Sequence, residues 1–303
     1  DEDGFFYDVL RLPVGGATRL RVRSLVGLLP LAACTVLRPE EVQRLPEFME
    51  RVFWLVEHRP KLVGNIPTLG EPGANNRRVL GVLDAQKLRR ILAVMLDENE
   101  FLSPYGIRSI SQFHRDHPYI LNVGDVEYRV DYLPAESNNR MFGGNSNWRG
   151  PIWFPMNLLL IRGLVTQYAY YGDDFTVECP TGSGQQMTLW EVSQEISRRL
   201  SRIFLQDTTG RRPVYGGLEK FQSDPHWRDY ILFHEYFHGD NGAGLGASHQ
   251  TGWTGVIAWI MQVYSSATDP EGALTTIAGR RPGRQSEPEN EKTDSPEISE
   301  TVE

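Results

Sequence analysis

The stretch Thr188-Leu-Trp-Glu-Val-Ser-Gln-Glu-Ile-Ser-Arg-Arg-Leu-Ser-Arg-Ile-Phe-Leu-Gln206 decides the fold class, because it carries the clearest hydrophobic periodicity of the chain. Its apolar residues recur every three or four positions, the spacing of one face of an α-helix. They are Leu189, Val192, Ile196, Leu200, Ile203 and Phe204. Thr188, followed three residues later by Glu191, makes a capping box at the start. The stretch therefore predicts an amphipathic helix with one buried face.

Other segments extend this helical pattern in both directions. Residues 84–98 carry one apolar stripe, with Asp84 placed to cap it. Further helices are predicted over residues 24–37, 40–58, 155–171, 225–237 and 252–265. Only residues 127–132 alternate clearly as a strand, and they are predicted to pair with residues 119–123 across a Gly-Asp turn. The chain is therefore predicted to be all-α with one small β-hairpin.

Long segments rich in Gly, Pro, Asn and Trp separate the predicted helices. They cover residues 59–82, 134–154, 207–224 and 238–251. Compact domains rarely carry loops of more than about 12–15 residues unless the loops have a function. The pattern favours a helical scaffold whose loops bind a ligand.

Composition excludes several classes of function. The chain has 303 residues and a formal net charge of −8, and seven acidic residues lie in the segment 283–303 alone. Phosphate binding needs clustered Lys and Arg, so a nucleic-acid partner is not predicted. Cys34 and Cys179 are too few and too far apart for a disulfide framework or a zinc site. No apolar run approaches the ~20 residues of a membrane span, so a membrane partner is not predicted either.

The segment Phe233-His-Glu-Tyr-Phe-His-Gly-Asp-Asn-Gly-Ala-Gly-Leu-Gly-Ala-Ser-His-Gln-Thr-Gly-Trp253 places Glu235 between aromatic residues and ahead of a glycine-rich loop. A general base needs a carboxylate that holds a water molecule and accepts its proton. Aromatic rings such as Tyr236 stack on sugar faces. Glu235 is therefore the candidate catalytic residue. The alternative is a solvated carboxylate near a helix end.

A second segment, residues 142–157, combines Trp148, Arg149 and Trp153 with three Asn on a glycine-rich loop. Sugar sites use such residues together, because rings cover the apolar faces while Asn and Arg bind the hydroxyls. The alternative is that these rings pack the loop onto the core. The short turn Ser103-Pro-Tyr-Gly-Ile-Arg-Ser109 places Tyr105 and Arg108, which fit either a binding or a structural role.

Other segments resemble known site motifs, but none is predicted to form such a site. Residues 239–246 lack the Gly-Lys-Ser/Thr of a phosphate loop and the alternating oxygen ligands of a calcium loop. His234 and His238 flank Glu235 at the spacing of zinc ligands, with His249 as a third candidate, but ordinary hydrogen-bonding histidines are the preferred interpretation. Ser183 lacks the glycine two residues on that a nucleophile elbow requires. No metal or other cofactor is predicted.

The segments 103–109, 147–153 and 235–254, in this order, resemble the C-terminal catalytic domain of glycoside hydrolase family 63, over roughly residues 1–265. That family includes the α-glucosidase that trims N-glycans and bacterial relatives acting on α-glucosides or mannosylglycerate. The resemblance implies an (α/α)6 barrel and inverting hydrolysis. It also implies that Glu235 is the general base and that Trp148, Arg149, Trp153 and Trp253 line the sugar pocket. Tyr236 and Tyr105 are further candidates for substrate binding.

The resemblance also implies what this chain lacks. The general acid of the family is an Asp upstream of the segment Asp3-Gly-Phe-Phe-Tyr7, near which this chain begins, so the chain is expected to be truncated and to form an incomplete barrel. Inversion needs both carboxyl groups, so the fragment alone is expected to be inactive. Residues 1–278 are assigned to the glycosidase domain and residues 279–303 to a disordered acidic tail.

The predicted function is thus hydrolysis of α-linked glucose or mannose from a small glycoside or oligosaccharide, in a cytoplasmic protein. Two alternatives remain open. One is a carbohydrate-binding module without catalysis, and the other is a helical interaction scaffold without a ligand.

Overall fold

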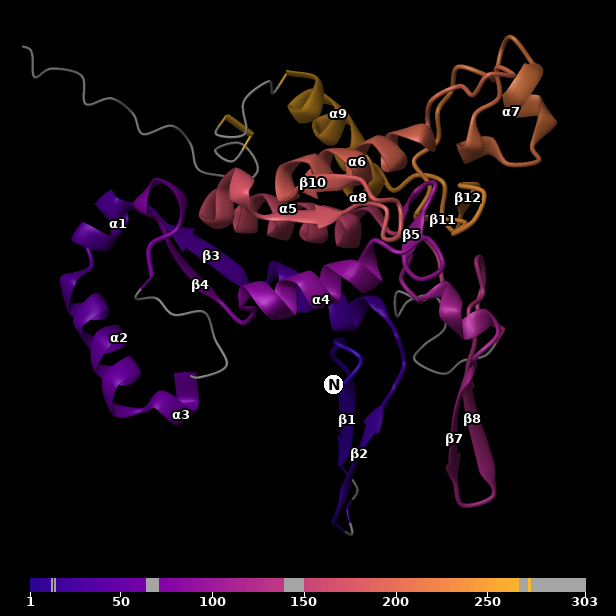
Figure 1. Ribbon diagram of the computed structural model, residues 1–303. Coiled ribbons are helices and arrows are strands. Elements are labelled where there is room, and N and C mark those ends of the chain that lie inside the picture. Colours follow the sequence, from indigo (N-terminus) through magenta and orange to yellow (C-terminus); the bar gives the residue numbers. More distant parts are fainter. Residues whose placement is uncertain (12, 14, 64–70, 139–149, 267–271, 274–303) are drawn as a thin grey trace, which may run out of the picture.

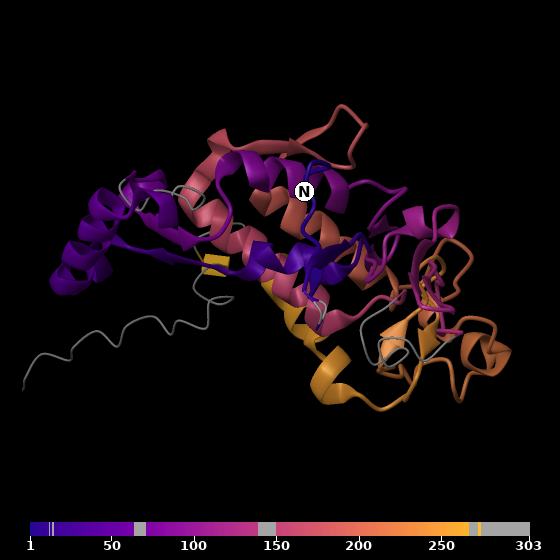
Figure 2. The same ribbon diagram turned by 90° about the horizontal axis from the view of Figure 1, so that it is seen from below.

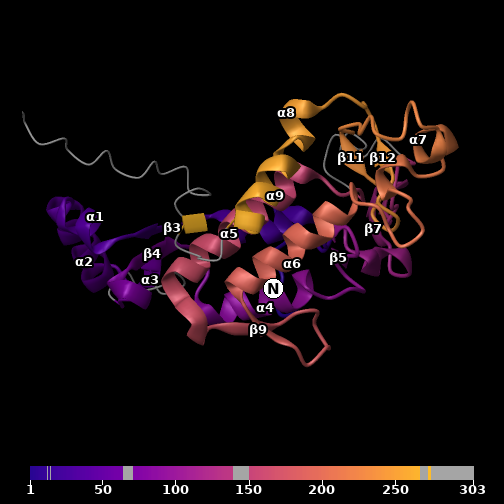
Figure 3. The same ribbon diagram turned by 90° about the horizontal axis from the view of Figure 1, so that it is seen from above.

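Helix α5, Phe154–Tyr171, lies at the centre of the fold in the computed structural model, which describes residues 1–11, 13, 15–63, 71–138, 150–266 and 272–273. It contacts α6 (Leu189–Arg202), α9 (Val256–Ser266) and the 3-10 helix η1 (Leu25–Ala32). Helix α4 (Ala85–Met95) packs against η1. Figure 1 shows α4, α5, α6 and α9 stacked in layers, and Figure 3 shows α9 running over α5 and α6. These elements enclose the core.

The main core is formed by the apolar faces of these helices. Its fully buried members include Leu88, Ile91, Leu92 and Met95 of α4, Leu160, Ile161 and Leu164 of α5, and Leu189, Val192, Ile196 and Leu200 of α6. Gly163 allows α5 to approach η1 closely, because a Cβ there would lie 2.6 Å from the Leu31 carbonyl oxygen. Burial on this scale is the main favourable contribution to the stability of the fold.

The predicted caps are present. Thr188 Oγ1 accepts a hydrogen bond from the Glu191 amide at 3.2 Å, and the Glu191 carboxylate accepts one from the Thr188 amide at 2.8 Å. Asp84 Oδ1 accepts a hydrogen bond from the Lys87 amide at 2.8 Å at the start of α4. Each cap satisfies amide groups that a helix N-terminus leaves without partners.

Six two-stranded antiparallel sheets occur among the described residues. The pairs are β1 (Asp8–Arg11) with β2 (Ala17–Leu20), β3 (Cys34–Leu37) with β4 (Arg78–Gly81), β5 (Leu102–Ser103) with β6 (Gly106–Ile107), β7 (Tyr119–Val123) with β8 (Val126–Val130), β9 (Thr176–Glu178) with β10 (Gln186–Thr188), and β11 (Tyr236–Phe237) with β12 (Gly244–Leu245). The hairpins β1–β2 and β7–β8 project away from the helical core (Figure 1).

The remaining helices lie at the two ends of the molecule. An arm of three helices lies at the end of the β3–β4 strand pair (Figure 1, Figure 2). It consists of α1 (Pro39–Gln43), α2 (Pro46–His58) and α3 (Pro60–Val63). At the other end lies α7 (Glu219–Ser223), beside β11 and β12, while α8 (Thr251–Thr254) leads into α9. Short 3-10 helices cover Ala74–Asn76 (η2), Gln112–Arg115 (η3), Gly172–Asp174 (η5) and Pro213–Tyr215 (η6).

Most of the predicted helices are confirmed. The predicted segments 84–98, 155–171 and 188–206 correspond to α4, α5 and α6, and the segment 252–265 corresponds to α8 and α9. The segment 40–58 is helical but is divided into α1 and α2, because Pro46 begins the second helix. The hairpin predicted for residues 119–132 is also confirmed, with Gly124 at a φ of +60° in its turn.

Two helix predictions are wrong in whole or in part. Residues 225–237 form turns and an extended segment, because the Phe233 carbonyl accepts a hydrogen bond from the Gln250 amide at 2.8 Å and Tyr236–Phe237 pairs with β12. These partners lie beyond the segment itself, so helical periodicity does not reveal them. Residues 24–37 are helical only at first: Leu25–Ala32 is a 3-10 helix containing Pro30, and Cys34–Leu37 pairs with β4.

The all-α prediction is corrected accordingly. The chain has a helical core that carries several small hairpins, and the described helices form no closed barrel. In the described part of the chain, no helix has both the length and the apolar character needed to cross a bilayer. The predicted acidic tail, residues 279–303, lies outside the described residues.

Candidate active site

The backbone of Ile152 joins the three segments that the sequence singled out. Its amide donates to the Phe237 carbonyl at 2.7 Å and its carbonyl accepts from the Phe237 amide at 2.9 Å. Ile152 also forms an antiparallel bridge with Arg108. The turn 103–109, the start of α5 and the Glu235 segment therefore meet at one place.

Asn157, buried in the first turns of α5, strengthens this junction. Its Oδ1 accepts a hydrogen bond from the Ile107 amide at 2.8 Å, and its Nδ2 donates to the carbonyls of Ile107 at 3.1 Å and Trp153 at 3.0 Å. The side chain is fully buried. Asn157 holds the turn against the helix that follows the Trp-rich loop, a role that sequence reasoning missed because an isolated Asn carries no pattern.

Glu235 lies on the extended segment immediately before β11, not near the end of a helix as predicted. Its amide donates to the Ala247 carbonyl at 2.8 Å, and its Oε2 accepts from the Ala247 amide at 3.3 Å. Among the described residues no donor reaches its other oxygen, Oε1. The side chain is half-buried. The carboxylate is thus anchored through one oxygen and can accept a hydrogen bond from water through the other.

The ring of Tyr236 lies next to this carboxylate, since a Cβ on Gly246 would come close to both groups. Trp153 and Trp253 form an aromatic cluster with Tyr236. The centroids of Trp153 and Tyr236 are 4.5 Å apart, and Trp253 meets Trp153 edge-on at 6.5 Å. Trp153 is only 2% exposed and Tyr236 only 6% exposed, whereas Trp253 is half-buried. Trp153 therefore supports the neighbouring rings in this structure, and Trp253 is the more accessible of the two indoles.

The other predicted binding residues are placed as follows. Tyr105 is half-buried and lies against the loop of the Glu235 hairpin, since a Cβ on Gly242 would come 2.8 Å from the Tyr105 ring. Trp148 and Arg149 lie outside the described residues. Sequence reasoning missed Glu136, whose Oε1 accepts a hydrogen bond from the Tyr236 hydroxyl at 2.7 Å. No sequence motif marks this carboxylate.

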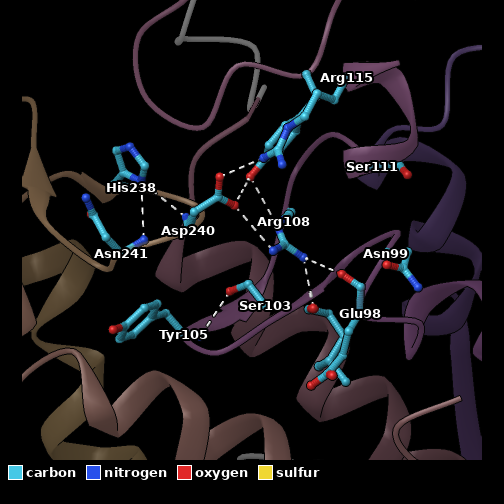
Figure 4. Close-up of polar contacts among 12 residues, drawn as sticks. Glu98, Asn99, Ser103, Tyr105, Arg108, Ser111, Arg115, His238, Asp240 and Asn241 are labelled. Carbon is cyan, nitrogen blue, oxygen red and sulfur yellow. Dashed lines mark hydrogen bonds and ion pairs between the residues drawn. The ribbon is translucent and has the colours of Figure 1, made fainter. Parts of the chain in front are cut away.

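A charged cluster holds the loop between β11 and β12. Asp240 Oδ1 accepts from the Tyr132 hydroxyl at 2.6 Å and from Arg108 Nη2 at 3.3 Å, and Oδ2 accepts from Arg115 Nη2 at 2.9 Å. Figure 4 shows Asp240 between the guanidinium groups of Arg108 and Arg115, with Tyr105 below Asn241 of the same loop. The turn 103–109 therefore contacts the β11–β12 hairpin, which follows Glu235, through both Tyr105 and Arg108.

Of the histidines in this region, His238 acts as a hydrogen-bonding group within the fold, whereas the buried Nδ1 of His234 has no hydrogen-bond partner among the described residues. His238 Nδ1 accepts from the amides of Asp240 at 3.1 Å and Asn241 at 3.3 Å. Burial lowers the pKa of His238 and of His234 below the ordinary value, so both favour the neutral form. Within the residues that the structure describes, no three His, Cys, Asp or Glu side chains are grouped to hold a metal ion.

A half-buried carboxylate with one unoccupied oxygen, beside aromatic rings and a glycine-rich loop, is typical of sites that bind and cleave carbohydrates. Comparison with known families gives the class a name. The mannosylglycerate hydrolase MGH1-like glycoside hydrolase domain matches residues 78–254. The chain belongs to this family of glycoside hydrolases.

Three fungal proteins are similar to the chain. An uncharacterized protein of Saccharomyces cerevisiae is 48% identical over 267 residues, which cover 87% of this chain and 24% of that protein. A probable mannosyl-oligosaccharide glucosidase of Schizosaccharomyces pombe is 26% identical, over 60% of this chain and 16% of its own length. The mannosyl-oligosaccharide glucosidase of Saccharomyces cerevisiae is 23% identical, over 59% of this chain and 15% of its own length. The chain thus spans less than a quarter of the length of these relatives.

Proposed function

We propose that the chain is part of an inverting glycoside hydrolase in which Glu235 is the general base. The observation that carries the proposal is the state of its carboxylate, which is anchored by the Ala247 amide through Oε2 while no donor among the described residues reaches Oε1. An inverting base must hold one water molecule on the face of the sugar opposite the leaving group. A fixed carboxylate with one open oxygen suits that task.

The proposed substrate is a glycoside or oligosaccharide with α-linked glucose or mannose. Membership of the MGH1-like family and the similarity to two proteins named as glucosidases support this class. Trp153, Tyr236, Trp253 and Tyr105 are proposed to form the sugar site, together with Trp148 and Arg149. Residues 1–278 are proposed to be part of an (α/α)6 barrel, which the stacking of α4, α5, α6 and α9 supports. A cytoplasmic location stays a prediction.

Inversion also requires a general acid on the other side of the scissile bond, with the two carboxyl groups about 6.5–9.5 Å apart. We assign no residue of this chain to that role. The reaction is therefore proposed for the full-length protein that contains this chain, and the isolated fragment is expected to be inactive.

The test is the Glu235→Gln variant of the full-length protein, assayed with mannosylglycerate and with α-glucosides. We expect turnover to fall by about 10²–10⁴-fold, because the amide cannot accept the proton of the attacking water. Glu57→Gln is a matched control, since the Glu57 side chain lies on α2 and is 80% exposed. Undiminished turnover in Glu235→Gln would disprove the assignment.

Chemical rescue sharpens this test. In Glu235→Ala, azide can enter the space of the missing side chain and attack the anomeric carbon without a base, expelling the aglycone to give a glycosyl azide of inverted configuration. We expect azide to restore turnover in this variant only. Formation of a glycosyl azide with retained configuration would contradict inversion.

The alternative is a carbohydrate-binding module without catalysis. It also accounts for the ring cluster around Trp153. Trp fluorescence of the full-length protein, titrated with the same glycosides, separates the two: saturable quenching with no turnover in the wild type supports the alternative. A helical scaffold without a ligand predicts no change in fluorescence with any sugar.

A further inference from the structure

The loop between β11 and β12 is held from outside its own hairpin. The Gly239 amide donates to the Pro134 carbonyl at 2.7 Å, and the Asp240 carboxylate accepts from Tyr132, Arg108 and Arg115. A Cβ on Gly239 would lie 2.6 Å from the Tyr132 hydroxyl oxygen, so the loop backbone lies directly on that side chain. The hairpin that follows Glu235 is thus fastened at its tip.

Arg108 is the fixed point of this attachment. Its side chain is only 5% exposed, and it donates from Nη1 to the carbonyls of Leu102 at 2.8 Å and Glu98 at 3.3 Å. Its Nε donates to the Tyr132 hydroxyl at 3.1 Å. Among the described residues, Asp240 is the acidic side chain that forms an ion pair with the Arg108 guanidinium. A buried guanidinium without a counter-charge is unfavourable, so Arg108 strongly favours the loop position that brings Asp240 to it.

Tyr132 completes the attachment. Burial raises the pKa of its phenol well above the ordinary value. At neutral pH the hydroxyl is therefore protonated and donates a hydrogen bond to Asp240. Arg115 differs from both neighbours, because its side chain is 45% exposed in the ion pair with Asp240. An exposed ion pair contributes little to stability, because water and salt screen it. The attachment of the loop therefore depends on Arg108 and Tyr132.

This attachment is transmitted to Glu235 through a short and well-bonded hairpin. The His238 amide donates to the Ala243 carbonyl at 2.8 Å, and the Gly242 amide donates to the His238 carbonyl at 3.0 Å. Tyr105 packs against Gly242 from the same turn, residues 103–109, that contains Arg108. A shift of Asp240 would therefore move β11, whose first residue follows Glu235 directly.

We propose that Asp240 is a positioning residue for Glu235: held by Arg108 and Tyr132, it fixes the β11–β12 loop and so sets the place of the Glu235 carboxylate relative to the bound sugar. The inference rests on the proposed function of Glu235. It assigns to the turn 103–109 the task of aligning the base, in addition to any contact of Tyr105 with substrate.

The test uses the full-length protein and the variant Asp240→Asn. The amide has the shape of the carboxylate and keeps an oxygen for the Tyr132 hydroxyl, but it loses the negative charge that pairs with Arg108. We expect kcat with mannosylglycerate or an α-glucoside to fall about 10- to 100-fold, because a misplacement of about 1 Å has an effect of that size. We expect KM to change less than kcat, because Trp153 and Trp253, two of the proposed sugar-binding rings, lie outside the β11–β12 hairpin.

Arg115→Gln is the matched control, because it removes the exposed pair to the same carboxylate. We expect its kcat to stay within about twofold of the wild type. Tyr132→Phe is the second variant in case Asp240→Asn does not fold. It keeps the ring and removes only the hydroxyl, which donates to Asp240 and accepts from Arg108 Nε, and we expect kcat to fall about 3- to 10-fold. Equal kcat in all three variants and the wild type would overturn the proposal.

Amide hydrogen exchange gives a readout that does not depend on turnover. In Asp240→Asn, peptides covering residues 235–247 should exchange faster than in the wild type, while peptides from α5 and α6 should be unchanged. Unchanged exchange in the hairpin would refute the positioning role even if activity were lost. Full activity of Glu235→Gln, by contrast, would refute the proposed base and leave the exchange result to decide whether Asp240 holds the loop.

Discussion

Gly246 lies so close to Glu235 that a Cβ on the glycine would come 2.8 Å from Glu235 Oε2 and 2.7 Å from the ring of Tyr236. Its φ of +68° is also in the left-handed region that residues with side chains rarely adopt. The glycine at position 246 thus has a local cause, which is the space taken by the carboxylate of Glu235 and the ring of Tyr236.

Gly246→Ala should therefore displace the Glu235 carboxylate from the Ala247 amide. We expect turnover of the full-length protein to fall at least about tenfold, because the base loses its alignment. Gly252→Ala is the control, since a Cβ there has no neighbour within 4 Å. A crystal structure or an activity assay of both variants checks this, and equal activity would contradict it.

Removing the side-chain amide of Asn157 should weaken the junction below the site. Asn157→Leu keeps the size of the side chain but leaves the buried amide and carbonyl of Ile107 without their partner. We expect the free energy of unfolding to fall by about 1–3 kcal/mol or more. Urea titration measures this loss. Leu159→Ala, at a 41% exposed position on the same helix, should change stability far less.

Helix α6 should depend on its capping box. Thr188→Ala removes the hydroxyl that accepts from the Glu191 amide, and we expect a loss of about 1 kcal/mol in the free energy of unfolding. Thr188→Ser keeps the hydroxyl and should stay close to the wild type. A loss of the same size in both variants would show that the methyl group, not the cap, stabilises this end.

Stability should fall as the pH is lowered from neutrality. Burial lowers the pKa of His114, His234 and His238 in the folded protein, whereas in the unfolded chain it is about 6.5. The unfolded state therefore binds more protons below about pH 6.5, and the stabilisation present above that pH is lost as the pH falls through the folded pKa values. Urea titrations at several pH values between roughly 7.5 and roughly 5 measure this loss in the free energy of unfolding. Constant stability would contradict the shifts.

Burial is the main cause of the lowered pKa of His114, and its hydrogen bonds define the neutral tautomer. Its Nε2 accepts from the Arg23 amide at 2.8 Å, so its Nδ1 carries the proton and donates to the His117 carbonyl at 2.9 Å. Protonation of Nε2 would break the first bond. NMR titration of the ring protons should therefore find that His114 stays neutral to a lower pH than an exposed histidine does.

Local patterns predicted the helical core correctly because the information lies within each segment. The stripe of Leu189, Val192, Ile196 and Leu200 and the cap at Thr188 are contained in one run of residues, and they determine one helix. The hairpin at Gly124 was predictable for the same reason. The candidate base was found from composition around Glu235, although the secondary structure assigned to it was wrong.

Only the tertiary structure decided how segments that are distant in sequence contact one another. By itself, the sequence determined that the chain is helical at its centre, that Glu235 stands among aromatic residues, and that a glycine-rich loop follows it. The fold decided that Ile152 bonds to Phe237, that residues 225–237 are extended, and that Asp240 pairs with Arg108 across 132 positions of the chain. The physical reason is that a helix satisfies its amides within its own segment, whereas an extended segment and a buried charge need partners that the rest of the fold must bring.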